Sequence, residues 1–588
     1  MNESETPTAV DLDACLRAPV HLSGAIQPHG YLVSCSRADW RIRHVSANVD
    51  ALFGLPADEL IGLPLNEFVE EDVLSQVSDT VAASVPGDAT AQRACTANVG
   101  ALMTICDVTA HAVDDLLHLE FEPQPARPTG GTPTTIAQRM VAQLGHDDGD
   151  PGFFRQVARL VQLLTGYDRV MIYRFREDDS GEVIAEVVPD DMEPYLGLRY
   201  PATDIPPPAR ALYLRNRIRI IPDATYQPVP LVPPLDPSGA PLDLSQHVLR
   251  SVAPVHLEYL RNMGVAASMS ISIVSGGRLW GLVACHHRAP RVVSASARAA
   301  ADLFGMFVSM RVAAREQELT LERFDRAQRL RDALALRLVR ARDFDRALAE
   351  ELELVREVLD CDGAGLSIGG SWHASGRAPA SRDPAPLLEW VARQGASEVL
   401  MTDTSTDWNN PVLGAPGLAG LMAINLGTPR DWLFLFRVEQ VETVSWAGQP
   451  RKAMVATDDG QRLAPRKSFA TWRETVSGRS RAWSASDLRG AGRLHLVLRE
   501  QRGHARSASR GREDIDDRYR RQKLQAQKLR LDGMASLLEG MFHLDAVETA
   551  SIEARIEALE ADLRRLMHRT QPERARSIEG GDVEMARF

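Results

Sequence analysis

Residues 268–287 read SMSISIVSGGRLWGLVACHH, and this stretch decides the class of fold. Two apolar runs, Ser268–Val274 and Leu279–Cys285, flank the turn signal Ser275-Gly276-Gly277. Glycine adopts the backbone conformations that tight hairpin turns need, so the pattern predicts two antiparallel strands joined by a short turn. A β-sheet is therefore expected near the middle of the chain.

The residues before this hairpin predict a mixed α+β domain. Phe153–Leu164 has the spacing of a helix, and Val170–Phe175 and Gly181–Val188 have the composition of strands. Residues Tyr200–Pro241 are rich in proline and predict a long loop region. Long loops in compact domains are usually functional or disordered, so this region is a candidate for function.

Changes of composition divide the rest of the chain. The first 122 residues predict a small α+β module of short strands and turns, and Pro123–Thr135 predicts a linker. Residues Ala297–Leu359 nearly lack glycine and proline, which predicts a long interdomain helix. A further α+β domain is expected from Asp360 to Leu498, with a long polar excursion at Trp446–Trp483.

The C-terminal part predicts helices that associate. Residues 502–530 are basic, with ten Lys and Arg against four Asp and Glu, and either contact an acidic partner or form a solvated face. Two a/d-spaced apolar series follow, which predicts a helical hairpin or coiled coil in a dimer. The two series are Leu524, Leu531, Met534, Leu538 and Met541, and Ile552, Ile556, Leu559, Leu563 and Leu566.

Composition excludes several classes of protein. The chain has 588 residues, 44% of them hydrophobic, and a net charge of −12, which argues against general nucleic-acid binding. Apolar runs stay shorter than the roughly 18–20 residues that span a bilayer, and the N-terminus is polar and acidic, so a cytoplasmic protein is expected. The six cysteines show no CxxC spacing, and no GxxxxGK[ST], GxSxG or HExxH motif occurs. Neither a catalytic site nor a metal site is expected.

Several long motifs occur in a characteristic order. They are CLRAPVHLSGAIQPHG at residues 15–30, YPATDIP at 200–206, RSVAPVHLEYLRNMG at 250–264, WGLVACHH at 280–287, PRKSF at 465–469 and WRE at 472–474. This set closely resembles the bacterial phytochromes, which are red/far-red photoreceptors that carry a linear tetrapyrrole. The resemblance covers about residues 11–500 in the order PAS, GAF and PHY.

The resemblance implies an α+β, multidomain PAS-GAF-PHY photosensory module with a long helical spine and a C-terminal helical hairpin or coiled coil. The expected boundaries are 1–122 for PAS with an N-terminal chromophore-attaching extension, 123–135 for the linker, 136–317 for GAF, 318–505 for PHY with a "tongue" at about 446–483, 506–570 for a helical output and dimerisation module, and 571–588 for a disordered tail.

The resemblance also implies the chromophore and its attachment. Cys15 matches the cysteine that forms a thioether to biliverdin IXα in the bacterial branch, a reaction that needs an accessible, activated thiolate. Another branch attaches its bilin through a cysteine where this chain has Val255, which favours biliverdin here. Cys285 is expected to be a packed apolar residue rather than an attachment site.

The matched motifs assign roles around the bilin. Arg219 and Arg250 would hold its two propionates, since guanidinium pairs with carboxylate in a bidentate manner. His286 would bond the carbonyl of ring D in the dark. The remaining expected contacts are Asp204, Ile205, Pro206 and His256 at the pyrrole N–H groups, Tyr213, Ser268 and Ser270 at the propionates, and Tyr173, Tyr200 and Tyr259 around ring D.

The tongue is expected to act as a switch. Arg466 would pair with Asp204 in the red-absorbing state, and Ser468 would replace it in the far-red-absorbing state as the tongue changes from hairpin to helix. Trp472 and Trp483 would exchange packing places. Such a segment is a bistable element that the chromophore biases. The pocket residues fit either state as the dark-stable one.

The output departs from the usual histidine kinase of the family. His543 in GMFHLD lacks the His-Glu signature, and no glycine boxes for nucleotide binding follow it. The preferred hypothesis is therefore a dimeric photoreceptor, not an enzyme, that signals through its C-terminal helices to a separate protein. The alternatives are a degenerate sensor histidine kinase with an ATP-binding partner in trans, and a GAF/PAS protein that binds another small ligand without responding to light.

Overall fold

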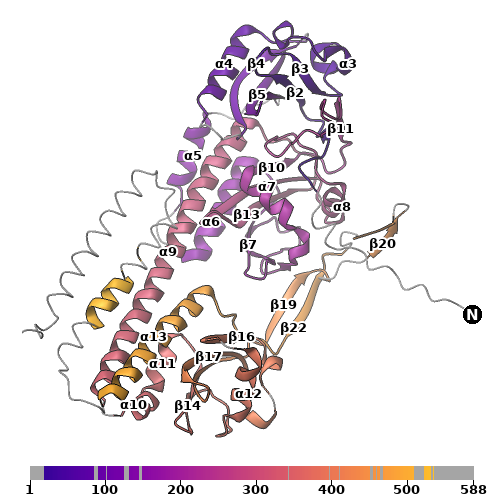
Figure 1. Ribbon diagram of the computed structural model, residues 1–588. Coiled ribbons are helices and arrows are strands. Elements are labelled where there is room, and N and C mark those ends of the chain that lie inside the picture. Colours follow the sequence, from indigo (N-terminus) through magenta and orange to yellow (C-terminus); the bar gives the residue numbers. More distant parts are fainter. Residues whose placement is uncertain are drawn as a thin grey trace, which may run out of the picture. The chain divides into compact units, whose positions relative to one another are not determined.

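The computed structural model in Figure 1 divides into two units. The first comprises Met1–Arg323 with Gln440–Ser477, and the second comprises Phe324–Glu439 with Gly478–Phe588. The described residues are 19–84, 90–100, 102–124, 131–144, 149–341, 343–395, 397–409, 411–449, 454–457, 460–463, 468–508, 522–530 and 534.

The first unit begins with a seven-stranded sheet in the order β1-β11-β3-β2-β6-β5-β4. Short helices pack on it: α2 (Asp50–Phe53), α3 (Ala57–Leu60) and α4 (Glu71–Ala82). The strands are β1 (Ala25–Ile26), β2 (Tyr31–Ser36), β3 (Ile42–Ser46), β4 (Gln92–Val99), β5 (Thr104–Val113), β6 (Leu116–Pro123) and β11 (Val229–Val232).

Strand β11 reaches this sheet from a distant part of the sequence. It pairs with both β1 and β3, so residues 229 and 230 lie along one edge of the N-terminal strand β1. On its other side, the N–H of Gln27 donates to Leu249 O at 2.7 Å and the N–H of Ser251 donates to Ala25 O at 2.9 Å. Residues 25–27 are therefore held between the two ends of one excursion, residues 229–251.

A second sheet of eight strands follows in the order β10-β12-β13-β7-β8-β9-β19-β22. The expected hairpin is confirmed as β12 and β13, and the two predicted strands before it are β7 and β8. The strands are β7 (Arg169–Phe175), β8 (Gly181–Val187), β9 (Arg199–Tyr200), β10 (Ile218–Ile221), β12 (Ala267–Ser275), β13 (Arg278–His287), β19 (Glu442–Ala447) and β22 (Thr471–Val476).

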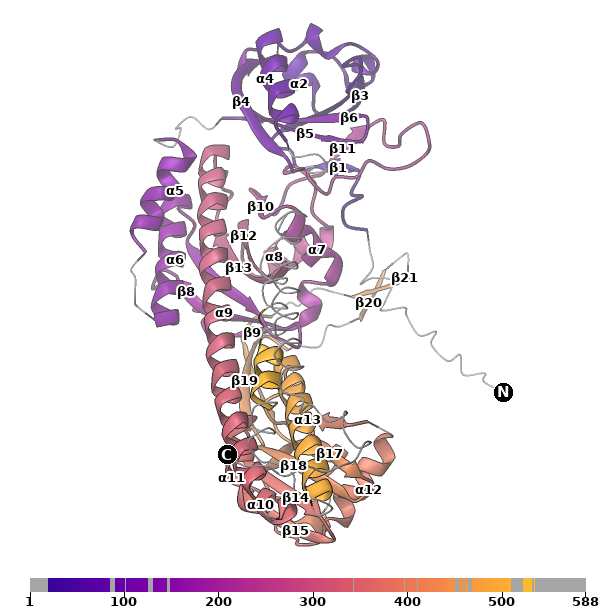
Figure 2. The same cartoon turned by 60° about the vertical axis from the view of Figure 1, so that its left-hand side comes forward.

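Helices cover both faces of the second sheet. In Figures 1 and 2, α5 (Pro133–Ala142), α6 (Gly149–Thr165) and the first part of α9 (Ala295–Arg340) lie side by side on one face, where their apolar residues form a common core with the strands. Helices α7 (Pro207–Arg215) and α8 (Pro254–Asn262) lie on the opposite face. The second face carries the polar residues that the sequence singled out.

The second unit contains a five-stranded sheet in the order β15-β14-β18-β17-β16. Helices α10 (Phe344–Glu350), α11 (Leu352–Val358) and α13 (Ala485–Ala508) pack on one face, and α12 (Ala385–Gln394) packs on the other. The strands are β14 (Gly363–Ile368), β15 (Ser371–Gly376), β16 (Val399–Thr402), β17 (Leu418–Thr428) and β18 (Asp431–Val438).

Two expectations about local structure need correction. The proline-rich stretch 200–241 is not a plain loop, because it contains α7, β10 and β11; Pro207 lies in the first turn of α7, where proline is tolerated. The helix predicted over 297–359 is not continuous, because α9 ends at Arg340 and the short helices α10 and α11 follow from Phe344. There the Asp343 side chain caps α10 by accepting from the N–H of Arg346 at 3.2 Å.

The C-terminal expectations are tested only in part. Helix α13 extends to Ala508, and residues 522–530 are helical. Arg502, at the start of the basic segment, is buried and its Nη2 lies 2.9 Å from an Asp431 carboxylate oxygen, so this residue neither faces solvent nor awaits a partner. His543, most of both heptad series and the tail lie outside the described residues.

Candidate functional site

Two buried arginines lie on the face of the second sheet that α7 and α8 cover. Arg219 on β10 is 9% exposed and Arg250, just before α8, is 6% exposed. Arg219 donates to His247 O at 3.1 Å and to Arg250 O at 3.4 Å. Arg250 donates to Val20 O at 2.8 Å. Both guanidinium groups therefore bind backbone carbonyls, which carry no net charge.

No ion pair neutralises the charge of these two arginines within the described part of the chain, where Glu120 and Asp243 act on them only from a distance. No described carboxylate lies within ion-pair distance of either guanidinium, and Arg250 Nε has no hydrogen-bond partner there. Burial, reinforced by the charge of Arg219, lowers the pKa of Arg250 to about 9, and burial also lowers the pKa of Arg219. Both groups still stay protonated at neutral pH, so the site attracts a ligand with two carboxylates.

Serine hydroxyls accompany the arginines on the same face. Ser270 on β12 is directly opposite Arg219 in the strand register, and Ser268 is opposite His286 on β13. Directly opposed residues of an antiparallel pair project to the same face of the sheet, as do residues two apart on one strand. Tyr213 on α7 lies over this face, since its carbonyl accepts a hydrogen bond from Ser272 at 2.7 Å.

His286 is buried in a form suited to hydrogen bonding. It is 8% exposed, and its Nδ1 has no partner among the described residues. Burial, together with the positive charge of Arg169, lowers its pKa to about 3, so the ring is neutral at pH 7. A neutral imidazole offers one donor and one acceptor, and His286 can supply either to a ligand.

The turn after β9 is tied to helix α8. The Tyr259 hydroxyl donates to Asp204 Oδ2 at 3.0 Å, and the rings of His256 and Tyr259 lie nearly parallel with centroids 6.1 Å apart. Arg210 donates to Ile205 O at 2.8 Å, and Pro206 immediately precedes α7. The predicted turn Asp204-Ile205-Pro206 and the predicted site residue His256 therefore lie close together, joined through Tyr259.

Aromatic residues form a cluster beside these polar groups. Tyr173 on β7 and Tyr200 on β9 have ring centroids 5.7 Å apart and are both buried. A Cβ at position 181 would lie 1.7 Å from Tyr173 Cζ, so Gly181 on β8 makes the space that the tyrosine ring fills. Sequence reasoning missed this glycine, because only the strand register reveals it.

The tongue joins the second sheet as a hairpin. Strands β19 and β22 pair with each other, and Trp446 on β19 pairs with Arg199 on β9. Phe469 packs edge-to-face on Tyr259, with centroids 5.1 Å apart, and belongs to the same apolar cluster as Tyr173 and Tyr200. Phe469 is thus a further site residue, for which the PRKSF motif at 465–469 predicts no role.

The other tongue residues differ in position. Ser468 is exposed next to Phe469, and Trp472 is 38% exposed on β22. Trp483 is 9% exposed and belongs to the core of the second unit, where its Nε1 donates to Thr402 O at 3.0 Å. Strands β20 (Met454–Thr457) and β21 (Gly460–Leu463) form a separate hairpin within the tongue. Arg466 lies outside the described residues.

Of the two cysteines considered for chromophore attachment, only Cys285 lies in the described part of the chain. Cys15 lies outside the described residues. Cys285 on β13 is fully buried in the core on the far side of the predicted contacts, and burial raises the pKa of its thiol. A buried neutral thiol is a poor nucleophile, in agreement with the expectation that Cys285 packs as an apolar residue.

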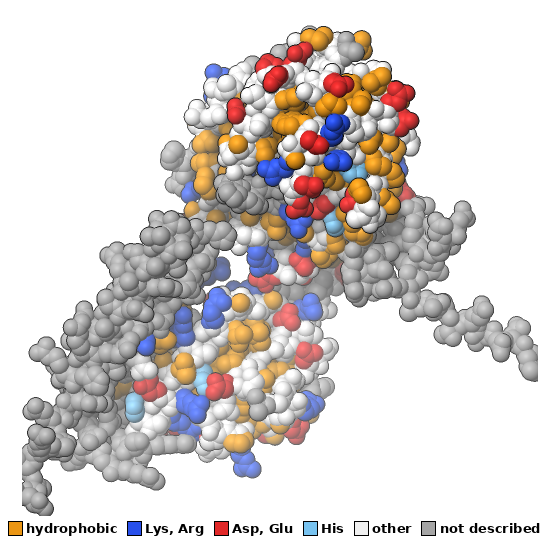
Figure 3. Space-filling model, turned by 45° about the horizontal axis from the view of Figure 1, so that its top comes forward, with side chains coloured by type: hydrophobic (Ala, Val, Ile, Leu, Met, Phe, Trp, Pro, Cys, Tyr) orange, Lys and Arg blue, Asp and Glu red, His pale blue; other side chains and the backbone are white. Residues whose placement is uncertain are grey.

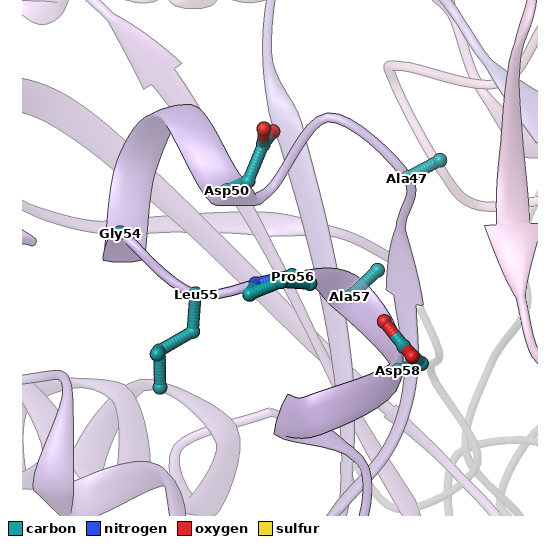
Figure 4. Close-up of a pocket in the computed structure, with 7 residues that line it drawn as sticks. All are labelled: Ala47, Asp50, Gly54, Leu55, Pro56, Ala57 and Asp58. Atoms are coloured by element: carbon teal, nitrogen blue, oxygen red, sulfur yellow. The ribbon is translucent and has the colours of Figure 1, made fainter.

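One surface pocket and one face of the described chain can be compared with this site. Figure 4 shows a surface pocket of about 520 Å³ on the first domain, but it contains none of the predicted site residues; it is lined by Ala47, Asp50, Gly54, Leu55, Pro56, Ala57 and Asp58. On the face shown in Figure 3, acidic, basic and apolar side chains are interspersed, so this face has no continuous basic patch. Within the described residues, no helix is both long and apolar enough for a membrane span.

Comparison with protein families gives three matches along the chain. The PAS fold matches residues 15–124, the GAF domain matches 152–312, and the phytochrome region matches 327–507.

Individual relatives cover most of the chain. A bacteriophytochrome from Pseudomonas aeruginosa is 38% identical over 499 residues, which are 84% of this chain and 67% of that protein. A bacteriophytochrome from Xanthomonas campestris pv. campestris is 35% identical over 515 residues, 84% of this chain and 79% of that protein. The chain thus spans about two thirds or more of the length of these relatives.

Solved structures resemble the same region. The crystal structure of a bacteriophytochrome from the photosynthetic bacterium R. palustris has a TM-score of 0.70 and 32% identity, covering 83% of this chain and 99% of that one. The photosensory core module of the Stigmatella aurantiaca phytochrome has a TM-score of 0.69 and 35% identity, covering 86% and 100%.

Proposed function

This chain belongs to the bacterial phytochromes, and from that premise we propose that it is a red/far-red photoreceptor carrying biliverdin IXα linked to Cys15 by a thioether. Membership of the family implies a bilin chromophore; the pigment, its linkage and the dimeric signalling state are the proposal. The observation that carries it is the pair Arg219 and Arg250, two buried cations without a carboxylate partner in the described chain. A bilin has two propionates, which match this charge in number and sign.

The residues around the arginines fit the remaining parts of such a pigment. Ser268 and Ser270 share the face of Arg219 and supply neutral hydrogen bonds to carboxylate oxygens. Neutral His286 supplies a donor for a carbonyl, and it can give up that bond at little cost because it carries no charge. Tyr173, Tyr200 and Tyr259 supply aromatic surface for the ring D end of the pigment, whose carbonyl His286 would bond.

When bound, the pigment supplies light absorption and isomerisation about a methine bridge. The chain's own task is to register that event. Asp204 is positioned by Tyr259, and Tyr259 also contacts Phe469 of the tongue. A displacement of Tyr259 therefore acts on Asp204 and on the tongue at the same time.

The tongue is held to the sheet in a way that allows its release. The pairing of β19 with β9 involves one residue pair, Trp446 and Arg199, whereas β19 and β22 pair over six. In the proposed switch, Asp204 pairs with Arg466 while the tongue is a hairpin and with Ser468 when it becomes a helix. The described hairpin corresponds to the first of these forms.

A homodimer is part of the proposal. Helix α9 exposes apolar residues at spacings of three and four: Leu303 at 41%, Met306 at 43% and Met310 at 64%. This spacing gives a continuous stripe on one side of a helix, as a packing face requires. We place signalling to a separate partner protein in the C-terminal helices, without an enzymatic activity of the chain itself.

Absorption spectroscopy tests the proposal directly. Purified full-length protein is mixed with biliverdin, and spectra are recorded in the dark, after red light and after far-red light. A red band that shifts reversibly is expected, and the dark band identifies the stable state. Pigment that binds without a reversible shift would contradict the photoreceptor, and no pigment binding would favour a different ligand.

A pair of cysteine variants tests the linkage. Cys15→Ser should abolish the pigment that survives denaturation while leaving pigment that is bound without a covalent bond. Cys285→Ser is the matched control and should retain the covalent adduct, because Cys285 is buried and its thiol is not activated. An adduct that persists in Cys15→Ser and disappears in Cys285→Ser would place the thioether at Cys285 and contradict the proposed linkage.

A further inference from the structure

Three buried histidines converge between the first sheet and the 229–251 excursion. His111 on β5 and His118 on β6 are direct cross-strand partners, and His247 comes from the excursion. They are 3%, 2% and 0% exposed. The three ring centroids lie 4.5 to 4.8 Å apart, and one nitrogen of each ring lies within 4.8 Å of the others.

The nitrogens of this cluster lack partners. Both ring nitrogens of His111 and both of His247 make no hydrogen bond within the described residues, although they are fully buried. A buried polar atom without a partner costs about 1–3 kcal/mol, so four such atoms in one place call for an explanation. Each neutral ring has one nitrogen with a free lone pair, so one lone pair from each histidine is available to a single shared partner.

We propose that His111, His118 and His247 form a structural binding site for a borderline divalent cation of the zinc class. Neutral imidazole nitrogens are ligands for Zn²⁺, Co²⁺, Ni²⁺ and Cu²⁺, whereas Mg²⁺ and Ca²⁺ prefer oxygen. Zinc bonds to histidine nitrogen at about 2.0–2.1 Å, so tetrahedral ligands are about 3.3 Å apart. The nitrogens would need to approach by up to about 1.5 Å, through ring rotation and a small shift of the excursion.

Neighbouring residues hold the histidines of the cluster in fixed positions, as the groups around metal ligands do. The Nδ1 of His118 is 2.8 Å from Ser34 Oγ, a contact of the kind that fixes the ring orientation of metal-bound histidines. Glu120 accepts hydrogen bonds from the N–H groups of Val248 at 3.0 Å and Leu249 at 2.6 Å, so it holds the excursion next to His247. The negative charge of Asp243 acts on His118 and offsets part of an ion's charge.

A cation at this site would connect two parts of the first unit. His111 and His118 belong to the first sheet, whereas His247 lies three residues before Arg250 in the excursion. The carbonyl of His247 accepts a hydrogen bond from Arg219. The ion would therefore fix the backbone that positions both arginines, although it would not touch the pigment. The inference does not depend on the proposed photoreceptor function.

The sequence predicts no metal site, because its cysteines show no CxxC spacing and no HExxH motif occurs. The three histidines lie 7 and 129 positions apart, and no motif links them. The strand register joins the first two, and the pairing of β1 with the excursion brings in the third.

Metal uptake by the full-length, tag-free protein tests the proposal. The protein is prepared without pigment, since linear tetrapyrroles can themselves chelate zinc, and is stripped with a chelator. It is then dialysed against micromolar Zn²⁺ and analysed for bound metal. One equivalent per chain is expected. His111→Gln, His118→Gln and His247→Gln should each weaken binding by at least about 100-fold.

His495→Gln is the matched control. His495 is equally buried, at 2%, but lies in the second unit, and its Nδ1 is 2.7 Å from Asn425 O. This variant should keep one equivalent of zinc. Wild-type protein that takes up no zinc would overturn the proposal, as would uptake that survives in His111→Gln and His247→Gln.

X-ray absorption of the zinc-loaded wild-type protein needs no variant and covers the case in which a substitution prevents folding. Three nitrogen ligands at about 2.0–2.1 Å are expected, with histidine scattering from the outer ring atoms. A shell dominated by sulfur or by carboxylate oxygen would place the ion elsewhere and overturn the proposal.

Discussion

Arg437 in the second unit and the pair Arg219 and Arg250 in the first are buried to a similar degree, at 2%, 9% and 6% exposed. Their surroundings differ. Arg437 Nη2 donates to Asp487 Oδ2 at 3.1 Å, its Nη1 donates to Ala482 O at 2.9 Å, and its guanidinium lies 3.8 Å from the ring centroid of Trp483. The other two arginines have backbone carbonyls and each other.

This difference separates a structural arginine from a binding arginine. The charge of Arg437 is neutralised inside its own domain, so the protein needs nothing further to bury it. Arg219 and Arg250 repel each other, and no carboxylate in the described chain forms an ion pair with either of them; Glu120 and Asp243 act on them only from a distance. Burying a charge without an ion-pair partner costs free energy of folding. A ligand with two carboxylates would offset that cost in the first unit when it binds.

The largest effect is expected from removing the binding pair. The double variant Arg219→Gln/Arg250→Gln should weaken biliverdin binding by about 1,000-fold, since hydrogen bonds to charged groups contribute about 1.5–3 kcal/mol each. The same variant should leave the pigment-free protein at least as stable as wild type, because two repelling buried cations are gone. Pigment titration and urea unfolding measure the two quantities.

Arg215→Gln is the matched control for this double variant. Arg215 also lies beside the site, on α7, but it is exposed. Its substitution should change pigment affinity less than about threefold, since exposed charges contribute about 0–1 kcal/mol. Equal losses in Arg215→Gln and the double variant would mean that net charge, rather than the buried pair, governs binding.

The structural arginine should show the opposite pattern. Arg437→Met should lower the free energy of unfolding of the second unit by about 3 kcal/mol, because it leaves Asp487 without its cation and Ala482 O without its donor. Pigment affinity should stay within about twofold of wild type. Urea unfolding followed by tryptophan fluorescence detects the loss. Adding Asp487→Asn should restore part of it; a double variant as unstable as the single one would refute the ion-pair explanation.

Acid should weaken the first unit through its neutral histidines. Burial lowers the pKa of His29, which faces Glu122 and Arg298, to about 4, and that of His286, which faces Arg169 and His256, to about 3. In the unfolded chain these histidines bind protons near pH 6.5, whereas in the folded chain they stay neutral until the pH is much lower. Stability is therefore full above pH 6.5 and falls as the pH drops, by on the order of 2 kcal/mol per histidine at pH 5.

Urea midpoints at pH 7 and pH 5 measure this loss. His29→Gln should show a smaller difference between the two pH values than wild type, by the share of one histidine. An equal difference in the two proteins would exclude His29 as a source of the acid sensitivity.

The smallest effect is expected at Trp472. Its exposed side chain pairs across the tongue hairpin with Trp446, and such cross-strand pairs contribute less than about 1 kcal/mol. Trp472→Ala should therefore change the urea midpoint of the dark protein little. Trp483→Ala should cost about 3 kcal/mol, because Trp483 is packed in the core of the second unit. Equal costs would show that the two residues do not occupy different environments in the dark.

Local patterns in the sequence predicted local structure well. Glycines between two apolar runs predicted the β12–β13 hairpin, and apolar spacing predicted α6, because neighbouring residues determine both features. The interruption of the long helix at Asp343 and the helix α7 within a proline-rich stretch were missed. A single capping residue or a first-turn proline decides such boundaries, and neither stands out from the background pattern.

The candidate site was predicted by motifs rather than by physical pattern. Resemblance supplied Arg219, Arg250, His256 and His286 together. The structure places Arg219 and His286 on strands of one sheet, and Arg250 and His256 just before and in α8, which covers one face of that sheet. Spacing alone could not join Arg219 to Ser270 or Gly181 to Tyr173, because strand pairing sets those contacts. The contact of Phe469 with Tyr259, and those of His247 with His111 and His118, join residues that are more than 100 positions apart.

The position of strand β1 has a consequence for the order of folding. Its two edges pair with residues 229–230 and with residues 249–251, which are more than 200 positions later in the chain. At about 5–20 residues per second, a ribosome makes these partners about 10–45 s after residues 25–27. During that time β1 has no partner on either edge, and the edge of β3 is open to wrong pairing. The first domain therefore cannot mature during synthesis as an independent unit; its sheet is completed only when the following domain has been made.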